Sequence, residues 1–169
     1  KELAKEPTTL EFGKPFTIDE VAIIFNYVIL SNKFNYMNTA VHTADSNYKF
    51  AIVDITSKNI GFEKKDFPFS FFQMKLKVDK GYRYEYDNSS KKLSEMSPED
   101  IETGYILFEI LEDTYPIELV INHSKYGEFI LPISQKDFFV CSSGNLYYID
   151  GDLDGDEEWS CLPIYSSYT

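Results

Sequence analysis

The segment 103–111 places the strongest constraint on the fold, because its apolar residues recur at every second position. In an extended strand, successive side chains point to opposite faces of the sheet. One face of this segment would carry Gly104, Ile106, Phe108 and Ile110. The other face would carry Thr103, Tyr105, Leu107 and Glu109, so it would be half covered rather than fully solvated. Such a strand needs neighbours on both sides, and the segment therefore predicts a central strand of a sheet.

Other segments of similar length also have strand character and are separated by turn residues. They are residues 12–18 (with a turn at 13–15), 21–30, 48–56, 71–78, 82–86, 117–121 and 128–133. Segment 21–30 is apolar at nearly every position, and a helix is an alternative there. Its β-branched and aromatic content favours a strand that is covered on both faces. Strands roughly 10 to 20 residues apart are typical of an all-β, immunoglobulin-like two-sheet antiparallel sandwich.

Composition supports this fold class and limits the choice of partner. Aromatic residues make up 17% of the chain, which favours sheets, and 169 residues are enough for one domain. The 28 acidic and 16 basic residues give a net charge of −12. This negative field repels nucleic-acid phosphates and anionic membrane surfaces, so we expect neither as a partner. It suits a protein partner with a basic surface.

The two ends of the chain are expected to lie outside the sandwich. Residues 1–9 are polar and predict a flexible tether, residues 10–134 hold the strand pattern, and residues 135–169 form an acidic C-terminal extension. The large apolar side chains of this extension predict that it packs on the sandwich. No apolar run reaches the roughly 18 to 20 residues of a transmembrane helix, and no signal peptide is present. We interpret the chain as an exported protein whose leader has been removed; a cytosolic protein is the alternative.

Cys141 and Cys161 are the two cysteines of the chain, 20 positions apart in the acidic extension. A disulfide between them would close a late loop and stabilise it by roughly 3 kcal/mol in the chain-entropy model. Two free thiols without a function are the alternative. The spacing is not that of a Cys-x-x-Cys redox pair, and two cysteines with two distant histidines do not predict a zinc site. We favour the disulfide, because the segment between the cysteines has little core of its own.

Several of these segments match, in order, the motifs of a known family. They are residues 12–14, residues 48–55 leading into Lys58-Asn-Ile-Gly61, the turn with Asp79, Gly81 and Tyr82, and residues 102–110, 117–121 and 128–133. Residues 10–134 thus resemble the telokin-like immunoglobulin-fold family of bacterial secreted and lipid-anchored proteins, a domain of unknown function. The family has Pro-Gly shortly before the central strand, where this chain has Ser97-Pro-Glu-Asp100. The resemblance implies an extracytoplasmic, non-enzymatic module, with a lipid anchor upstream of this sequence as one option, and supplies no catalytic residues.

The acidic run at residues 150–158 is the sharpest local motif. Asp150, Asp152 and Asp154 stand at the first, third and fifth positions of a calcium loop, with Gly155 at the sixth. Position 12 would be Cys161 instead of the bidentate glutamate that such loops carry. The ligands of a calcium ion would be Asp150, Asp152, Asp154, Asp156 and Glu158. A solvated acidic loop held by the disulfide is the alternative.

Aromatic clusters offer a second kind of candidate site. Tyr82, Tyr84 and Tyr86 lie on one face of a predicted strand and could form a platform for a sugar or a peptide. Ordinary cross-strand packing is the more common use of such a series. A second cluster, Phe67, Phe69, Phe71 and Phe72, predicts core packing or, alternatively, a patch that binds a partner.

No catalytic motif is expected. His42 and His123 lie in predicted loops and read as surface residues, and the chain contains no nucleophile elbow, phosphate loop or dinucleotide fingerprint. The leading hypothesis is an extracytoplasmic, non-enzymatic binding module that contacts a protein partner. An immunity or inhibitor protein that neutralises a secreted toxin or enzyme is the first alternative, because charge accelerates encounter with a basic target. A calcium-dependent hydrolase is the second.

Overall fold

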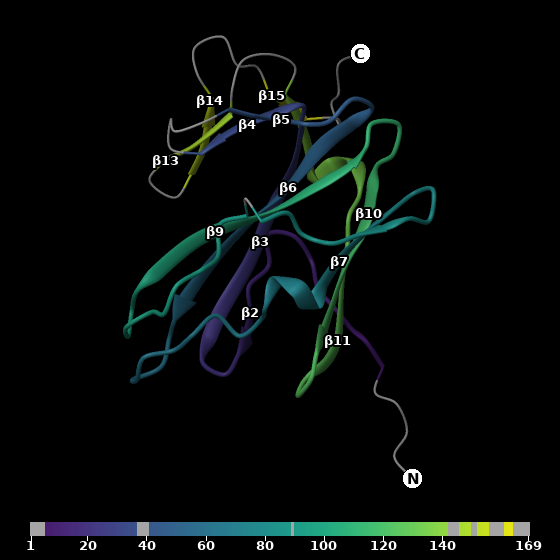
Figure 1. Cartoon of the computed structure of the whole chain (residues 1–169). Coiled ribbons are helices and arrows are strands. Elements are labelled where there is room, and N and C mark those ends of the chain that lie inside the picture. The colour runs from purple at the N-terminus through teal and green to yellow at the C-terminus, as the bar shows by residue number, and fades with distance from the viewer. Residues whose placement is uncertain are drawn as a thin grey trace.

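The computed structural model describes residues 6–36, 41–88, 90–141, 146–149, 152–155 and 161–163 (Figure 1). Strands form two main sheets that pack face to face. The first sheet has the order β1 (Thr8–Thr9), β11 (Gly127–Pro132), β10 (Pro116–His123), β7 (Met74–Val78) and β8 (Arg83–Tyr84). The second has the order β15 (Cys161–Pro163), β12 (Phe138–Cys141), β3 (Val21–Ser31), β6 (Tyr48–Asn59) and β9 (Ile101–Leu111), and β2 (Phe16–Ile18) also pairs with β3.

A third, smaller sheet lies beyond the end of β3 (Figure 1). Its order is β14 (Asp152–Gly155), β13 (Leu146–Ile149), β4 (Lys33–Tyr36) and β5 (Val41–Thr43). The described residues contain two short 3₁₀ turns, η1 (Phe71–Gln73) and η2 (Gln135–Asp137), and no α-helix. Accordingly, no helix in the described part of the chain is long and apolar enough to cross a membrane.

The predicted all-β two-sheet sandwich is confirmed, and segment 21–30 forms a strand rather than a helix. Most strand pairs are antiparallel, as expected. Among the strands that the structure describes, three pairs are parallel instead: β1 with β11, β12 with β3, and β13 with β4. Each of these pairs joins a strand from near one end of the chain to a strand distant in sequence, where no tight hairpin dictates the direction. This is the kind of pairing that local sequence patterns do not reveal.

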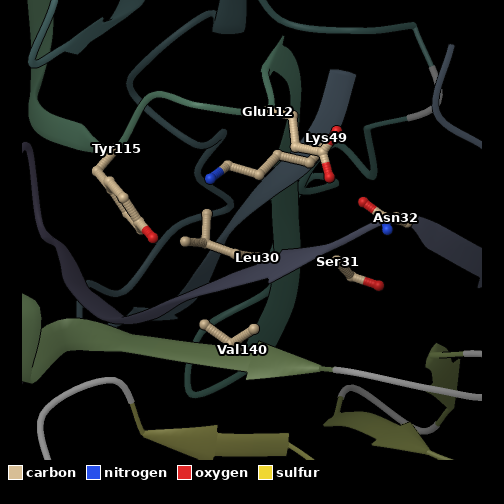
Figure 2. A pocket seen from close by; sticks show the side chains of 7 residues that line it. All are labelled: Leu30, Ser31, Asn32, Lys49, Glu112, Tyr115 and Val140. Atoms are coloured by element: carbon tan, nitrogen blue, oxygen red, sulfur yellow. The ribbon is translucent and has the colours of Figure 1, made fainter. Parts of the chain in front are cut away.

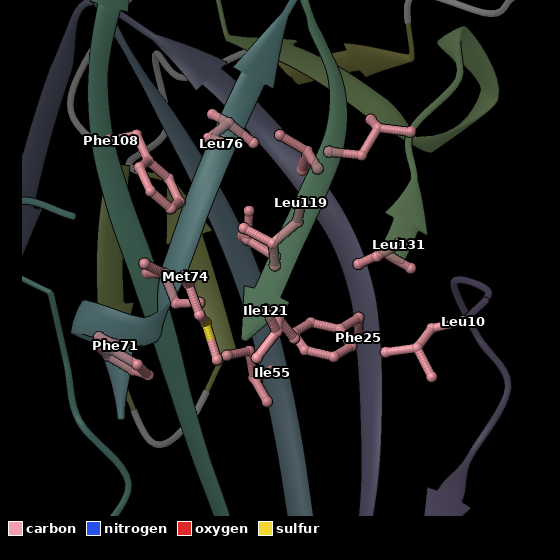
Figure 3. Close-up of a cluster of buried hydrophobic side chains, with 14 of the residues drawn as sticks. Leu10, Phe25, Ile55, Phe71, Met74, Leu76, Phe108, Leu119, Ile121 and Leu131 are labelled. Carbon is pink, nitrogen blue, oxygen red and sulfur yellow. The ribbon is translucent and has the colours of Figure 1, made fainter. Parts of the chain in front are cut away.

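The core lies between the two main sheets and is built from the residues that alternate inward (Figure 3). β9 contributes Phe108 and β3 contributes Phe25, and both belong to one buried cluster with Met74, Leu119 and Leu131 of the facing sheet. Each such side chain stabilises the fold by about 1.5–3 kcal/mol when it leaves water. The alternation in segment 103–111 is therefore the feature that fixes the orientation of β9.

The second face of β9 is covered as well. Tyr105 and Leu107 are 1% exposed and form a smaller cluster with residues of β3 and β6 on the outer side of their sheet. In β3, Asn26 and Tyr27 together lie opposite Asp54 as a β-bulge. The bulge brings Asn26 Nδ2 within 2.7 Å of Asp54 Oδ2, so the buried carboxylate receives a hydrogen bond. The expected half coverage of this face is thus an underestimate.

Residues near both chain ends belong to the main sheets, although the sequence predicted a tether at 1–9 and an extension at 135–169 outside the sandwich. Thr8 and Thr9 pair with Phe129 and Ile130 of β11, so the ordered chain starts before residue 10. β12 pairs with β3 inside the second main sheet, and the extension therefore starts as a strand of the sandwich rather than as a layer on it. The sandwich therefore extends at both ends of the chain to the strands that β11 and β3 pair with.

The outer edge of β9 is covered by an edge segment made of Asp87, Ser90 and Lys91. The backbone N–H of Lys91 donates to the carbonyl of Tyr105 at 3.0 Å, and the N–H of Tyr105 donates back to the Lys91 carbonyl at 3.2 Å. The N–H of Asp87 donates to the Leu107 carbonyl at 2.7 Å, and the Ser90 hydroxyl accepts from the Leu107 N–H at 2.8 Å. The edge segment thus satisfies backbone groups that an open edge would leave free to pair with another chain.

Candidate binding site at one end of the sandwich

Three turns meet at one end of the sandwich. The backbone N–H of Asp79, after β7, donates to the carbonyl of Tyr115 at 2.9 Å, and the Tyr115 N–H donates to Asp79 Oδ1 at 3.1 Å. Lys80 and Asp113 form an ion pair between the same two turns. The N–H of Glu112 donates to the carbonyl of Asn47, which precedes β6, at 2.8 Å. The turns at residues 45–47, 79–82 and 112–115 therefore form one connected surface, which we call the turn end.

Tyrosine side chains are exposed at the turn end. Tyr48, Tyr82 and Tyr115 have 36%, 54% and 45% of their surface exposed, and they come from three different segments of the chain. Of the predicted aromatic platform, Tyr82 is here, whereas Tyr84 and Tyr86 are half-buried and pack against the main core. Tyr86 makes an edge-to-face contact with Phe71 at 6.0 Å between ring centroids. The structure therefore places Tyr82 and Tyr115 in two of the turns that meet at this end, and Tyr48 as the first residue of β6, directly after the third turn.

Lys49 occupies an inward-facing position at the turn end. It alternates with Ala51, Val53 and Ile55 of β6, which are fully buried, and is itself only 8% exposed. Because Lys49 stands near the start of the strand, its side chain reaches the end of the sandwich and projects into a cavity of about 270 Å³ (Figure 2). The lining residues are Leu30, Ser31, Asn32, Lys49, Glu112, Tyr115 and Val140. A charge in phase with buried positions was the available sequence signal for this site.

The ammonium group of Lys49 lies against an aromatic ring. Its Nζ is 4.2 Å from the ring centroid of Tyr115, within the range of a cation–π contact. Among the side chains that the structure describes, no carboxylate forms an ion pair with it. Burial lowers the pKa of Lys49, and the negative charges of Glu112, Asp79 and Asp113 oppose this shift without cancelling it. The cavity thus contains a cation that has lost much of its hydration.

We expect Lys49→Met to raise the free energy of unfolding at pH 7 by about 1 kcal/mol, because it removes the cost of burying the charge while keeping an unbranched side chain that is one atom shorter. The folded-state pKa of Lys49 is lowered, so wild-type stability relative to the variant should rise with pH between that pKa and about 10.4, the ordinary value. In this window the unfolded chain holds a proton that the folded chain has lost. Urea unfolding of both proteins from pH 7 to 10 measures the difference, and comparison with the variant cancels the other groups that face Lys49. A constant difference across this range would contradict the prediction.

A second, broader hollow adjoins this cavity. It has a volume of about 690 Å³ and is lined by Asn47, Lys80, Tyr82, Leu111, Glu112 and Asp113. Glu112 lines both hollows, so the Lys49 cavity and the Tyr82 hollow are neighbours on the turn end. The concave part of this surface therefore combines aromatic side chains with charges of both signs.

The predicted calcium ligands lie only partly within the described residues. Asp152 and Asp154 belong to β14, an extended strand that pairs with β13. Asp150, Asp156 and Glu158 lie outside the described residues. Among the side chains that can be described, no three His, Cys, Asp or Glu residues are grouped as metal ligands would be. The calcium site stays a prediction of the sequence.

The backbone register of the two cysteines is described, whereas the disulfide between them stays a prediction of the sequence. Cys141 in β12 and Cys161 in β15 are direct cross-strand partners in an antiparallel pair. We expect replacement of both by serine to lower the free energy of unfolding by about 3 kcal/mol under oxidising conditions and to have little effect once the wild type is reduced. Urea unfolding with and without reductant measures both differences. A count of two free thiols in the denatured, oxidised protein would contradict the pairing.

The remaining aromatic and histidine candidates are mostly structural. Phe69 and Phe71 are buried in the core, Phe67 packs beside them, and Phe72 is 68% exposed. His123 is half-buried: its Nδ1 accepts from the N–H groups of Lys125 and Tyr126, and its Nε2 lies 3.0 Å from the Pro68 carbonyl. His123 therefore fixes a turn instead of standing free on the surface. The side chain of His42 lies outside the described residues.

Comparison with known proteins fits this arrangement of strands. Residues 10–129 match the family described as a domain of unknown function, DUF4352. The chain belongs to the DUF4352 family. The match covers nearly the same residues as the predicted sandwich, 10–134, and includes the strands that position the turn end. A search of curated proteins gives no match to this DUF4352 chain.

Solved structures similar to this DUF4352 chain are β-sandwich or bacterial proteins of low sequence identity. An uncharacterized β-sandwich protein from Clostridium difficile has a TM-score of 0.59 at 12% identity, covering 79% of this chain and 99% of that one. A conserved hypothetical protein from Bacillus anthracis has a TM-score of 0.50 at 14% identity, covering 76% and 98%. The secreted protein MPT63 from Mycobacterium tuberculosis has a TM-score of 0.49 at 16% identity, covering 76% and 99%. The first of these likenesses supports the two-sheet sandwich.

Proposed function

We propose that this protein is an extracytoplasmic, non-enzymatic interaction module that binds a basic protein partner through the turn end. The observation that carries the proposal is that three exposed tyrosines, Tyr48, Tyr82 and Tyr115, stand in or directly beside three separate turns that meet at one end of the sandwich. Loops at the end of a sandwich are a common position for recognition, because the strands hold them while their sequences vary.

The chemistry of the turn end suits protein recognition. Tyrosine buries a large area, loses little conformational entropy and keeps a polar hydroxyl, and it is enriched in protein interfaces for these reasons. The net charge of −12 favours a basic partner and accelerates encounter with it at low ionic strength. The adjoining Tyr82 hollow supplies concave surface, and Glu112 and Asp113 on its lining supply acidic contacts.

The location outside the cytoplasm is part of the proposal. It is supported by the family resemblance of residues 10–134 and by the predicted disulfide between Cys141 and Cys161, since disulfides persist in oxidising compartments. The cross-strand register of the two cysteines is compatible with that pairing.

The test is capture of a partner by the immobilised chain from a cell-envelope extract, followed by a titration of the purified partner. We expect one basic protein that binds the wild type in a stoichiometric, salt-sensitive complex. The combined replacement of Tyr48, Tyr82 and Tyr115 by serine should weaken binding by about 100-fold or more, since each aromatic anchor of an interface contributes about 1–2 kcal/mol or more.

A matched variant at the opposite end of β6 controls for loss of exposed apolar surface. Ile60, Phe62 and Ile101 are 47%, 95% and 61% exposed and lie where β6 ends and β9 begins. Their combined replacement by serine should leave binding unchanged. Equal loss of binding in both triple variants, or capture of proteins that both variants retain, would contradict recognition by the turn end.

A further inference from the structure

Lys49 is placed where a charged side chain normally costs stability. It is more than nine-tenths buried and projects into the cavity at the turn end (Figure 2). Removing an ammonium ion from water without a countercharge costs several kcal/mol unless other contacts offset the loss. The ring of Tyr115 offsets part of this cost, because a cation–π contact is worth about 0.5–2 kcal/mol. A ligand with a negative group would supply the remaining partner.

The other groups of the cavity leave room for such a ligand. The Ser31 hydroxyl is engaged within the chain, since it donates to the Lys33 carbonyl at 2.8 Å. Figure 2 shows the Lys49 ammonium directed toward Tyr115, and the Glu112 side chain also lines the cavity. Leu30 and Val140 provide apolar wall on the remaining sides. The cavity therefore combines a cation, an aromatic face and aliphatic contacts with one carboxylate, Glu112, that forms no ion pair with the described Lys49 ammonium.

We propose that the Lys49 cavity binds a carboxylate group, with the Lys49 ammonium as its ion-pair partner and Tyr115, Leu30 and Val140 contacting the part of the ligand that carries it. A volume of about 270 Å³ is below the roughly 300–1,000 Å³ of pockets for drug-sized ligands. The occupant is thus a small organic acid, or one acidic side chain or chain terminus of a protein. The inference goes beyond the proposed function, because a free small acid would satisfy it without any protein partner.

The salt dependence of anion binding should distinguish the Lys49 cavity from a patch of exposed lysines, because the chain as a whole is acidic. With a net charge of −12, the long-range field repels anions, and added salt screens that repulsion. The short-range pair inside the cavity is screened much less. Binding of a carboxylate at Lys49 should therefore persist at 0.3 M salt, where adsorption of anions to exposed lysines is lost.

The test is an NMR titration of the isotopically labelled full chain with benzoate, and with benzamide as a neutral analogue of the same shape. We expect saturable shifts of the Lys49 and Tyr115 signals with benzoate only. Lys49→Met should weaken benzoate binding at least about tenfold, the loss of roughly one ion pair. The matched control is Lys125→Met, at an exposed lysine outside the turn end whose ammonium lies 5.2 Å from the ring centroid of Tyr126, and this variant should bind benzoate as the wild type does.

The Lys49→Met variant is expected to fold, because the substitution removes a buried charge, and its unfolding curve confirms this independently. Benzoate binding that is absent, that is equal in Lys49→Met, or that benzamide matches would overturn the inference. A second arm compares N-acetyl-Gly-Gly-Phe carrying a free carboxyl terminus with the same peptide amidated. Tighter binding of the free-terminus peptide than of benzoate assigns the site to a protein terminus, and tighter binding of benzoate assigns it to a small acid. The partner capture described above is measured separately, so failure of either proposal leaves the other intact.

Discussion

Replacement of Asn59 by alanine is expected to lower the free energy of unfolding by about 4 kcal/mol. The Asn59 side chain is fully buried at the end of β6. Its Nδ2 donates to the carbonyls of Glu63 and Met96 at 2.7 and 2.9 Å, and its Oδ1 accepts from the N–H of Gly61 at 2.9 Å. Alanine would leave these three backbone groups without their partner, at about 1–1.5 kcal/mol each.

Thermal and urea unfolding measure this loss, which corresponds to a fall in melting temperature of about 10 °C for a chain of this length. Asn122→Ala is the matched control: Asn122 is exposed in β10, and its replacement should change stability by no more than about 0.5 kcal/mol. Asn59→Asp should not rescue, because a carboxylate would turn both donors into acceptors that face carbonyl oxygens. If Asn59→Ala is as stable as the wild type, the prediction is wrong, because water would then satisfy the three backbone groups that the side chain binds.

Replacement of Gly104 by valine is expected to cost at least about 4 kcal/mol. A Cβ atom on Gly104 would lie 2.6 Å from the backbone carbonyl oxygen of Lys91 and 2.9 Å from Leu93 Cδ1. The clash is with backbone, so no rotation of a side chain relieves it, and the edge segment must move away from β9. About four hydrogen bonds between the edge segment and Tyr105 or Leu107 would be lost, at about 1 kcal/mol each.

Unfolding curves and amide hydrogen exchange test this prediction together. The N–H groups of Tyr105 and Leu107 should exchange faster in Gly104→Val, and Gly104→Ala should show a smaller effect in the same direction. Thr103→Val is the control on the same strand, one position away and on the opposite face, and should stay within about 1 kcal/mol of the wild type. Unchanged protection of Leu107 in Gly104→Val would mean that the edge segment does not hold β9 as described.

Both variants concern residues that the sequence motifs contained but did not explain. Asn59 stands in Lys58-Asn-Ile-Gly61, and Gly104 stands in the central strand. In the sequence, Asn59 was part of a motif of the family resemblance, and Gly104 was one member of the apolar face of a predicted strand. In the folded chain Asn59 connects two loops that are distant in sequence, and Gly104 makes room for the edge segment to approach. Their roles depend on residues about 13 to 37 positions away, which no local pattern specifies.

In the candidate site, too, the sequence shows a local pattern, and contacts between distant residues give that pattern its role. The alternation of Lys49 with Ala51, Val53 and Ile55 was readable, and it placed a charge in phase with the core. The contact that stabilises this charge is made by Tyr115, 66 positions later, whose ring lies beside the Lys49 ammonium. Tyr82 was singled out with Tyr84 and Tyr86 because they alternate, yet it is exposed beside Asn47, Leu111 and Glu112, whereas Tyr84 and Tyr86 pack against the core. Periodicity identifies faces of a strand, but it does not identify which turns meet.

The amino-acid sequence by itself determined the class of the fold, because strand period, aromatic content and turn residues are local properties that each segment carries alone. It also determined the residue range that matches the DUF4352 family. The tertiary structure alone decided which interior strands pair with β1 and β12, and that both pairs are parallel. It also decided how the edge of β9 is covered and that Tyr115 lies beside Lys49 at the turn end. These features depend on contacts between distant segments, whose closure entropy is offset only when the whole sandwich forms.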